Sequence, residues 1–305
     1  MIYTLTLNPA IDYVAHVEKL TSGSIMRSED ENVFFGGKGI NVSTILHEHK
    51  IDTVAMGFIA GFTGKAIEHG LKEKGINTDF IYLDNGFTRI NVKIRAETET
   101  DINGKGPFIS AEHLSQLAEK LKILTSVDNL VLAGSIPPSV PDDIYENIMK
   151  EHYGKNINYV VDATGKLLLN SLKYNPFLIK PNTDELGEIF SVNITTTEDA
   201  YKYALKLKDK GARNVLVSMG GNGAVLLDET GKQHYMPAYK GKAVNTVGAG
   251  DSMVAGFIAG YEKTGDYEYA LKLGTASGSA TALSEGLADI NKINQLLKQD
   301  GRNNK

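Results

Sequence analysis

Short apolar runs alternate with amphipathic segments along most of the chain. From residue 54 onward, each run resembles a strand buried on both faces of a sheet, and the segments between the runs have apolar residues at helical spacing. We predict strands at 129–133, 158–161, 177–179 and 214–219, and helices at 63–74, 110–124, 142–150, 165–172, 183–190 and 198–210. This alternation indicates an α/β fold with a mostly parallel sheet and helices on both faces.

The N-terminal third of the chain has a different pattern. A first strand is predicted at 2–7, and short β-like pieces follow at 13–17, 32–35 and 88–95. In the last piece, one face carries Ile90, Val92 and Ile94, and the other carries Arg89, Asn91, Lys93 and Arg95. These pieces predict a small sheet separate from the main core. Its charged face is a candidate basic patch, although for Lys93 and Arg95 a solvated face is the preferred interpretation.

Composition and charge narrow the class of protein. With 305 residues we expect one large domain with an appendage, or two domains. A formal net charge of −5 argues against binding to nucleic acid or to an anionic membrane, which both depend on many Lys and Arg contacts.

The lack of cysteine excludes disulfides, thiolate metal sites and a Cys nucleophile. No apolar run is long enough to span a membrane and no signal peptide is recognisable, so we expect a cytoplasmic protein without membrane partners and with disorder only at 299–305.

The stretch Val244–Gly256 concentrates unusual residues. Gly248 and Gly250 free the backbone just before Asp251, and the small apolar residues that follow favour a packed helix. The first amide groups of a helix have no intrahelical partner and carry partial positive charge, so a glycine turn here can surround an anion beside a carboxylate. Taken alone, Asp251 could instead be a helix cap.

Other polar or glycine-rich segments follow predicted strands, and the carboxyl ends of parallel strands share one edge of a sheet. They include Asp12, Gly36–Gly39, Gly134–Pro138, Asp162–Thr164, Lys180–Glu185 and Ser218–Gly223. Asp12 is either a binding residue or a turn carboxylate. Asn182 and Glu185 could hold water on Mg²⁺ or simply cap a helix, and Gly220–Gly223 is either a phosphate loop or a tight hairpin. Neither a P-loop nor a dinucleotide fingerprint fits these glycines.

Four motifs, in this order and over nearly the whole chain, resemble those of the pfkB family of ribokinase-like sugar kinases. They are Gly36-Gly37-Lys38-Gly39 with Asn41, Gly134-Ser135-Ile136-Pro137, Asn182-Thr183-Asp184-Glu185 and Gly248-Ala249-Gly250-Asp251. Within the family, Thr6–Asp12 and Val247–Gly256 are most similar to bacterial 1-phosphofructokinases, with tagatose-6-phosphate kinases as close relatives. The resemblance implies a single ribokinase-like domain over 1–305: a three-layer α/β/α sandwich with a small β-sheet lid formed by insertions at about 12–35 and 86–99.

The resemblance also implies roles for individual residues. Asp251 would be the general base, and the amides of Gly248, Ala249 and Gly250 would form the anion hole for the transferred phosphoryl group. Sugar hydroxyls would be held by Asp12, Gly37 and Asn41, and the phosphate already on the substrate by Arg27, Lys38, Arg89 and Ser135. The ATP phosphates would face Lys180, Asn182, Ser218, Gly220, Gly221 and Gly223. Glu185, together with Asn182, would act on Mg²⁺ through water.

The implied activity is ATP-dependent phosphorylation of a ketohexose phosphate, with fructose 1-phosphate as the leading substrate. Tagatose 6-phosphate, fructose 6-phosphate, an unphosphorylated sugar and a non-catalytic sugar-phosphate sensor are the alternatives. In the family the lid excludes water and in many members pairs with a second lid, which implies a homodimer in which Arg27 acts in its own subunit or across the interface. Ser139 departs from the related pattern, where glycine is common.

Overall fold

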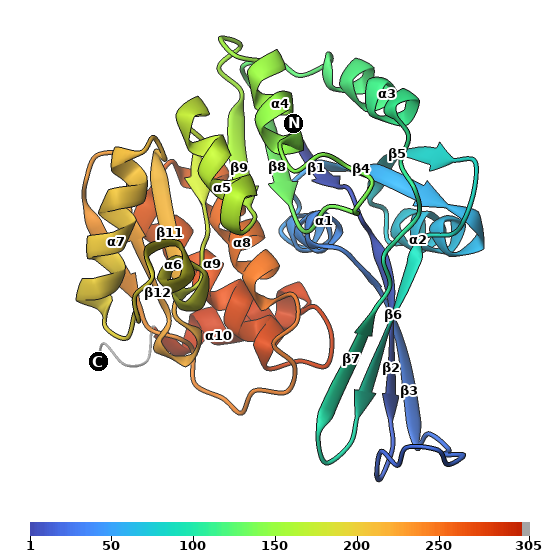
Figure 1. The fold of residues 1–305 in the computed structure, drawn as a ribbon. Coiled ribbons are helices and arrows are strands. Elements are labelled where there is room, and N and C mark those ends of the chain that lie inside the picture. The colour runs from blue at the N-terminus through green and yellow to red at the C-terminus, as the bar shows by residue number, and fades with distance from the viewer. Residues whose placement is uncertain (301–305) are drawn as a thin grey trace.

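The structure, a computed structural model, describes residues 1–300 (Figure 1). Its strands are β1 (Ile2–Thr6), β2 (Ala10–His16), β3 (Asp30–Gly36), β4 (Thr53–Ala60), β5 (Asn77–Leu83), β6 (Arg89–Arg95), β7 (Glu99–Asn103), β8 (Asn129–Ala133), β9 (Asn158–Asp162), β10 (Leu178–Ile179), β11 (Asn214–Ser218), β12 (Ala224–Leu227) and β13 (Gln233–Met236). Its α-helices are α1 (Lys38–Glu48), α2 (Gly61–Glu73), α3 (Ala111–Leu121), α4 (Ile144–Glu151), α5 (Gly165–Ser171), α6 (Thr183–Phe190), α7 (Thr197–Asp209), α8 (Ala249–Thr264), α9 (Tyr267–Ala282) and α10 (Ile290–Asp300). Two 3-10 turns, η1 (Leu172–Tyr174) and η2 (Gly220–Asn222), complete the set.

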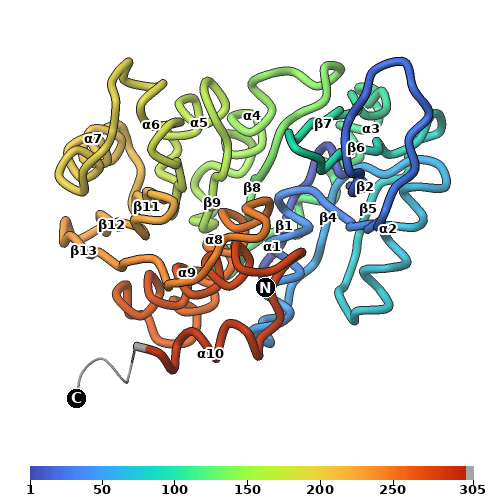
Figure 2. Tube along the Cα trace, turned by 90° about the horizontal axis from the view of Figure 1, so that it is seen from below, coloured from blue at the N-terminus to red at the C-terminus, as the bar shows by residue number. Residues whose placement is uncertain are grey.

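The main body is a nine-stranded sheet between two helical layers. Its strand order is β13-β12-β11-β10-β9-β8-β1-β4-β5, parallel from β11 to β5, with the antiparallel hairpin strands β12 and β13 at one edge. Strand β8 shows why the central strands read as apolar runs: Leu130 and Leu132 pack into the core on one face, and Val131 and Ala133 into the core on the other. Helices α3, α4, α5 and α7 cover the first face and α1, α8, α9 and α10 the second (Figure 2). The predicted three-layer α/β/α fold is therefore confirmed.

A smaller four-stranded sheet projects from one end of the body, at the lower right of Figure 1. Its order is β3-β2-β6-β7; β2 pairs with β6 in parallel, and the outer pairs are antiparallel. We call this sheet, β2, β3, β6 and β7, the lid. The β2–β3 hairpin begins after the carboxyl end of β1 and the β6–β7 hairpin after that of β5, so both belong to the same edge of the main sheet.

Close packing of α8 against α9 fixes the start of α8. A Cβ atom at Gly256 would lie 2.6 Å from the carbonyl oxygen of Leu273, and one at Gly274 would lie 2.8 Å from that of Met253. Only glycine permits this approach of the two helix backbones. The helix that begins at the glycine turn before Asp251 is therefore held in place by its packing against α9.

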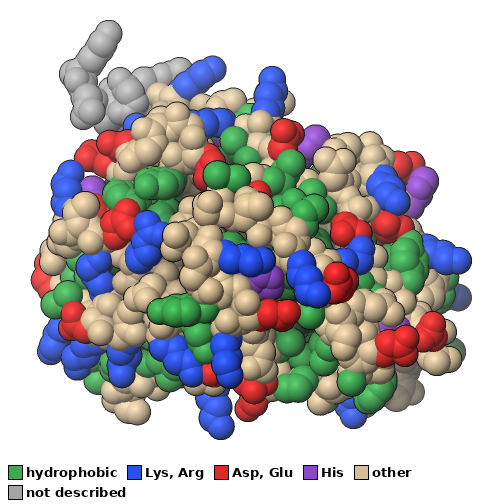
Figure 3. Space-filling view, turned by 90° about the horizontal axis from the view of Figure 1, so that it is seen from above, with side chains coloured by type: hydrophobic (Ala, Val, Ile, Leu, Met, Phe, Trp, Pro, Cys, Tyr) green, Lys and Arg blue, Asp and Glu red, His purple; other side chains and the backbone are tan. Residues whose placement is uncertain are grey.

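Several predicted boundaries shift by a few residues, and one expectation fails. The predicted strand 177–179 is shortened to β10, and the predicted helix 110–124 ends at Leu121. Gln299, expected to begin a disordered tail, belongs to α10, whereas 301–305 lie outside the described residues. No helix within residues 1–300 is long and apolar enough to cross a membrane. Seen from above, acidic and basic side chains are interspersed, apart from a group of Lys and Arg at the lower left (Figure 3).

Candidate active site

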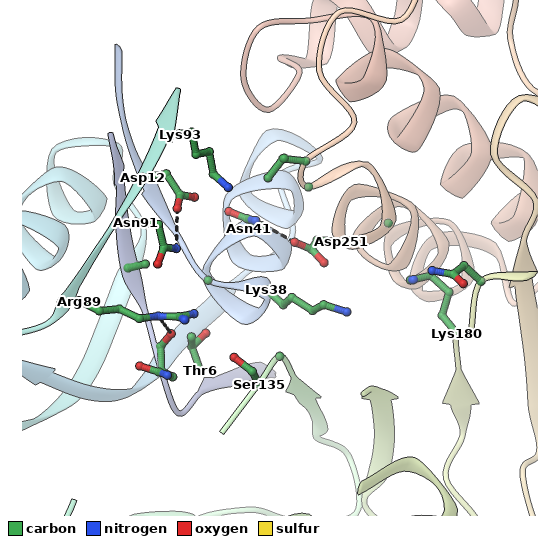
Figure 4. A pocket seen from close by; sticks show the side chains of 18 of the residues that line it. Thr6, Asp12, Lys38, Asn41, Arg89, Asn91, Lys93, Ser135, Lys180 and Asp251 are labelled. Atoms are coloured by element: carbon green, nitrogen blue, oxygen red, sulfur yellow. Dashed lines mark hydrogen bonds between the residues drawn. The ribbon is translucent and has the colours of Figure 1, made fainter. Parts of the chain in front are cut away.

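Most of the predicted site residues line one cavity of about 460 Å³, which lies between the lid and the carboxyl ends of the strands of the main sheet. The predicted residues that line it are Asp12, Gly37, Lys38, Asn41, Arg89, Ser135, Lys180, Asn182, Glu185, Ser218, Gly248, Gly250 and Asp251. Its volume lies within the range usual for small-ligand sites. Figure 4 shows Asp12, Asn91, Arg89 and Lys93 on the lid side, Lys180 on the opposite side, and Asn41 with Asp251 between them.

Asp251 lies in the first turn of α8, at the centre of this arrangement. Gly248 precedes the helix with φ of 79°, a left-handed conformation that favours glycine. The Asp251 side chain is buried, and its Oδ2 accepts a hydrogen bond of 2.7 Å from Nδ2 of Asn41 (Figure 4). Burial and the nearby Asp162 carboxylate raise the pKa of Asp251 to about 6, against the opposing effect of Lys38, Asn41 and Lys180. A carboxylate with this pKa can act as a base near neutral pH.

Two lysines converge on Asp162, a buried carboxylate that the sequence analysis placed at a strand end without assigning it a role. Nζ of Lys38 lies 3.1 Å and Nζ of Lys180 lies 3.4 Å from Oδ1 of Asp162, at the end of β9. Burial alone would raise the pKa of Asp162, but the two lysines lower it, so the carboxyl is ionised. Burial likewise opposes the charge on Lys38, and the Asp162, Asp251 and Glu185 carboxylates raise its pKa above the ordinary value. Asp162 therefore holds both cations at the cavity.

The first turn of α8 comes close to one of these lysines. A Cβ atom at Gly250 would lie 3.0 Å from Nζ of Lys180. Among the described residues, the amides of Gly248 and Gly250 have no hydrogen-bond acceptor, whereas the amide of Ala249 donates to the Thr246 carbonyl at 3.2 Å. Ala249 also lies outside the cavity lining. The turn thus presents the Gly248 and Gly250 amides beside a lysine, which suits an anion.

The lid side of the cavity is a polar network. Asn91 donates from Nδ2 to Oδ1 of Asp12 at 2.8 Å, and its Oδ1 accepts from the Gly104 amide at 3.2 Å. The Arg89 guanidinium donates to the carbonyls of Asn8 and Gly104 at 3.2 and 3.3 Å. Burial lowers the pKa of Arg89 and the Asp12 carboxylate opposes this effect. Asp12 is therefore held by a neighbouring strand and is not a solvated turn carboxylate.

The preferred interpretation of Lys93 and Arg95 as a solvated face is wrong. Lys93 is 8% exposed and lines the cavity, and its Nζ lies 3.0 Å from Oδ2 of Asp101 on β7. Arg95 is half-buried and donates to Oδ1 of the same carboxylate at 2.8 Å. The alternating pattern separated the two faces of β6 correctly, but the polar face borders the cavity, and its cations pair with Asp101 on β7.

Asn182 and Glu185 form a capping box at the start of α6. The Glu185 amide donates to Oδ1 of Asn182 and the Asn182 amide donates to Oε2 of Glu185, both at 2.8 Å. The capping interpretation is confirmed, and both side chains also line the cavity. The box uses one of the two carboxylate oxygens of Glu185. No group of three or more His, Asp or Glu side chains that could hold a metal ion by itself occurs within residues 1–300.

Some predicted residues lie outside the cavity. Gly220, Gly221 and Gly223 belong to the hairpin between β11 and β12, as one interpretation of the sequence held, and the Met219 amide donates to the Gly223 carbonyl at 2.8 Å. Arg27 is exposed in the loop that joins β2 to β3. Their proposed contacts with ATP and with the substrate phosphate remain predictions. The Oγ of Ser139 accepts from the Ile109 amide at 3.0 Å and ties two loops together.

Sequence reasoning missed several residues of the cavity. Thr6, Asn8, Ala10, Asn91, Lys93, Gly134 and Val247 line it without having been assigned a role there. Asn8 lies two residues after the end of β1, so the rule that polar residues at strand ends gather at one edge could have found it. The same rule did identify Asp162, but not its contacts with the two lysines. The lid residues could be found only by knowing which face of β6 the cavity occupies.

Comparison with known proteins places these features in one family. The chain matches the family described as "pfkB family carbohydrate kinase" over residues 4–294. It is 47% identical to the 1-phosphofructokinase of Bacillus subtilis, over 98% of each chain, and 38% identical to the D-tagatose-1-phosphate kinase of Bacillus licheniformis, also over 98% of each. Among solved structures, it resembles Escherichia coli phosphofructokinase-2 in complex with substrates and products, with a TM-score of 0.92, 26% identity and 98% of each chain covered. Arabidopsis thaliana ribokinase shares the fold, with a TM-score of 0.78 and 20% identity over 97% of this chain and 98% of the ribokinase.

Proposed function

The chain belongs to the pfkB family of carbohydrate kinases, and from this premise we propose that it phosphorylates fructose 1-phosphate to fructose 1,6-bisphosphate. Family membership makes it a sugar-phosphate kinase, a phosphotransferase acting on an alcohol group, and implies ATP as the donor. The observation that supports phosphoryl transfer at this site is the buried Asp251, which Asn41 holds between the lid and the two lysines, Lys38 and Lys180. The fructose 1-phosphate assignment rests on the similarity to enzymes named 1-phosphofructokinase.

Asp251 would act as the general base. The substrate hydroxyl gives its proton to the Asp251 carboxylate while its oxygen attacks the γ-phosphorus of ATP, and ADP leaves with the electrons of the broken bond. With a pKa raised to about 6, the carboxyl is mostly ionised at pH 7 yet basic enough to take the proton. General-base assistance of this kind contributes roughly 10²–10⁴ in rate. Asp12 and Asn41 would orient the sugar hydroxyls, with Gly37 leaving room for them.

Charge building on the transferred phosphoryl group would be stabilised by the α8 turn. The unpartnered amides of Gly248 and Gly250 supply donors, and Lys38 and Lys180 supply positive charge held in place by Asp162. Positioning and electrostatic stabilisation account for most of the catalysis of phosphoryl transfer. Ala249, whose amide already has an acceptor, would contribute through the backbone geometry of the turn.

The residues at the Lys180 side of the cavity fit ATP with a magnesium ion. Mg²⁺ usually keeps several waters and takes one or two carboxylates together with nucleotide phosphates. Glu185 retains one carboxylate oxygen outside its capping box, and with Asn182 it would hold the ion through water. When bound, the ion would neutralise charge on the phosphates. Ser218 and the hairpin backbone at Gly220, Gly221 and Gly223 would complete the ATP contacts.

The phosphate already on the substrate would lie on the lid side, away from ATP. Arg89 and Ser135 line that part of the cavity, and Lys38 lies between it and Asp251 (Figure 4). A second candidate substrate is tagatose 1-phosphate, because relatives named D-tagatose-1-phosphate kinase are 38% and 31% identical to this chain. Tagatose 6-phosphate and fructose 6-phosphate remain further alternatives, each named for a relative or neighbour of lower identity.

The lid would also mediate a homodimer. Val33 and Ile102 on lid strands are 57% and 59% exposed, and Ile25, near Arg27, is 95% exposed. A neighbouring structure is described as a tetrameric inhibited form of Escherichia coli phosphofructokinase-2, so assembly occurs in the family. Because Arg27 lies in the loop between β2 and β3 and not at its own cavity, we propose that it reaches the substrate of the partner subunit.

The experiment that tests the base assignment is the Asp251→Asn substitution. The amide can still accept from Asn41 but cannot take a proton, so turnover should fall at least about a hundredfold while calorimetric binding of ATP and sugar phosphate persists. Turnover near that of the wild type would refute the assignment.

A further inference from the structure

A buried cation on the cavity face of the lid has no role in the reaction described above. Lys93 lies on β6, two residues beyond Asn91 and four beyond Arg89, so the three side chains leave the strand on the same face. All three line the cavity. Figure 4 shows Lys93 pointing into it from the lid, on the side of Asp12 and opposite Lys180. With 8% exposure, Lys93 is buried to a degree that is rare for lysine unless it is paired.

The pairing partner of Lys93 can release it. Asp101 accepts a hydrogen bond from Lys93 at Oδ2 (3.0 Å) and one from Arg95 at Oδ1 (2.8 Å), so it would keep the Arg95 cation if Lys93 left. The Asp101 side chain is 39% exposed, and solvent can replace the second hydrogen bond. Among residues 1–300, Asp101 is the only hydrogen-bond acceptor of the Lys93 ammonium, which has three donors. Lys93 is thus held at the cavity but not saturated.

The position of Lys93 points to the kind of group it meets. The lysine pair and the α8 turn occupy the side on which the γ-phosphoryl group of ATP arrives, which leaves the lid side to the sugar phosphate. On that side, the group best matched to an ammonium is the phosphate, because a charge-assisted hydrogen bond is about twice as strong as one to a neutral hydroxyl. Resting on the function proposed above, we propose that Lys93 is a specificity-determining residue, whose ammonium leaves Asp101 to bind the phosphate already on the sugar.

Three substitutions separate this role from a structural ion pair. Lys93→Met, which keeps the length and apolar stem of the side chain, should raise the KM and the calorimetric Kd for fructose 1-phosphate at least about tenfold, as loss of a hydrogen bond between charged groups predicts. The kcat and the KM for ATP should stay within about twofold. Lys93→Arg should recover most of the affinity. Asp101→Asn should leave the KM unchanged or lower it, because the competitor for Lys93 has lost its charge.

Arg95→Met is the matched control. It removes a cation from the same strand and the same carboxylate, but Arg95 does not line the cavity, so the KM should stay within about twofold. Thermal unfolding of each variant checks that the lid is intact. Equal increases in KM for Lys93→Met and Asp101→Asn would reveal a structural pair and overturn the inference. A Kd for fructose 1-phosphate that is unchanged in Lys93→Met would also overturn it.

Two further readouts keep this inference apart from the proposed reaction. Inorganic phosphate should compete with fructose 1-phosphate less well in Lys93→Met than in the wild type, and equal competition would exclude a phosphate contact. If the wild type binds fructose 1-phosphate without turning it over, the proposed reaction fails while the ratio of calorimetric Kd values still tests Lys93. If the wild type does not bind fructose 1-phosphate, both proposals fail.

Discussion

The burial of Asp251 implies that this carboxylate, which we propose as the general base, destabilises the fold when it is ionised. Its pKa is raised from 3.8 to about 6, chiefly by burial. One pKa unit corresponds to about 1.4 kcal/mol, so ionised Asp251 lowers the free energy of unfolding by at most about 3 kcal/mol. Asp251→Asn removes the ionisable group and keeps an oxygen for the Asn41 hydrogen bond, so we expect the variant to be more stable by about 1–3 kcal/mol.

The pH dependence of this gain identifies its origin. The pKa of Asp251 is higher in the folded state than in the unfolded state. Ionisation therefore costs no folding free energy when Asp251 is protonated in both states, and the cost grows as the pH rises from about 4 to 6. The gain in Asp251→Asn should therefore be complete at pH 8, about half as large at pH 5, and small at pH 4. In a chain of this size it should raise the Tm at pH 8 by roughly 2–6 °C.

Scanning calorimetry of wild type and variant at pH 5 and pH 8 measures the effect. Asp142→Asn, which neutralises an exposed carboxylate outside the cavity lining, is the control and should shift the Tm little at either pH. A Tm at pH 8 that is unchanged or lower in Asp251→Asn would refute the reasoning. An equal increase at both pH values would refute it as well, because the gain would then not come from a titrating group.

Three further predictions concern turnover. In the wild type, kcat/KM for the sugar phosphate should fall below about pH 6 as Asp251 protonates. In Asp162→Asn this fall should occur at lower pH, because the Asp162 charge raises the pKa of Asp251. A fall at the same pH as in the wild type would assign the titration to the substrate phosphate. Gly250→Ala would place a Cβ 3.0 Å from Nζ of Lys180 and displace that ammonium slightly, so kcat in steady-state assays should fall by about tenfold or less. A normal kcat would show that the reaction does not depend on the packing of Lys180 against the turn. Glu185→Gln preserves a capping box but removes the charge, so its Mg²⁺ titration should shift to higher concentration, and superimposable titrations would leave Glu185 as a cap alone.

Local patterns were sufficient to predict the elements that are fixed locally. Strand β8 is apolar at every position after Asn129 because both of its faces are buried, and its predicted bounds are those observed. The capping box at Asn182 and Glu185 also follows from spacing alone. In contrast, β7 was not predicted, because Glu99, Asp101 and Asn103 give it a polar composition, and its strand conformation depends on pairing with β6.

The contacts that sequence reasoning missed are those defined by tertiary register. Lys38 and Asp162 are 124 residues apart, and only the neighbouring positions of their elements in the fold bring them to 3.1 Å. The alternation in β6 defined two faces, but no local signal identified the one that borders the cavity. Lys93 was therefore assigned to solvent, although it is buried against Asp101. The turn at Gly248–Asp251, by comparison, was visible because glycines and a carboxylate lie within a few residues of one another.

The most direct test of the proposed function is a coupled ADP-release assay with purified protein, ATP and Mg²⁺. The sugars are fructose 1-phosphate, tagatose 1-phosphate, fructose 6-phosphate, tagatose 6-phosphate and free fructose, each titrated for kcat/KM. We predict the highest kcat/KM for fructose 1-phosphate, with fructose 1,6-bisphosphate as the product. A higher kcat/KM for any other sugar, or no ADP release above the rate of ATP hydrolysis without sugar, would contradict the proposal.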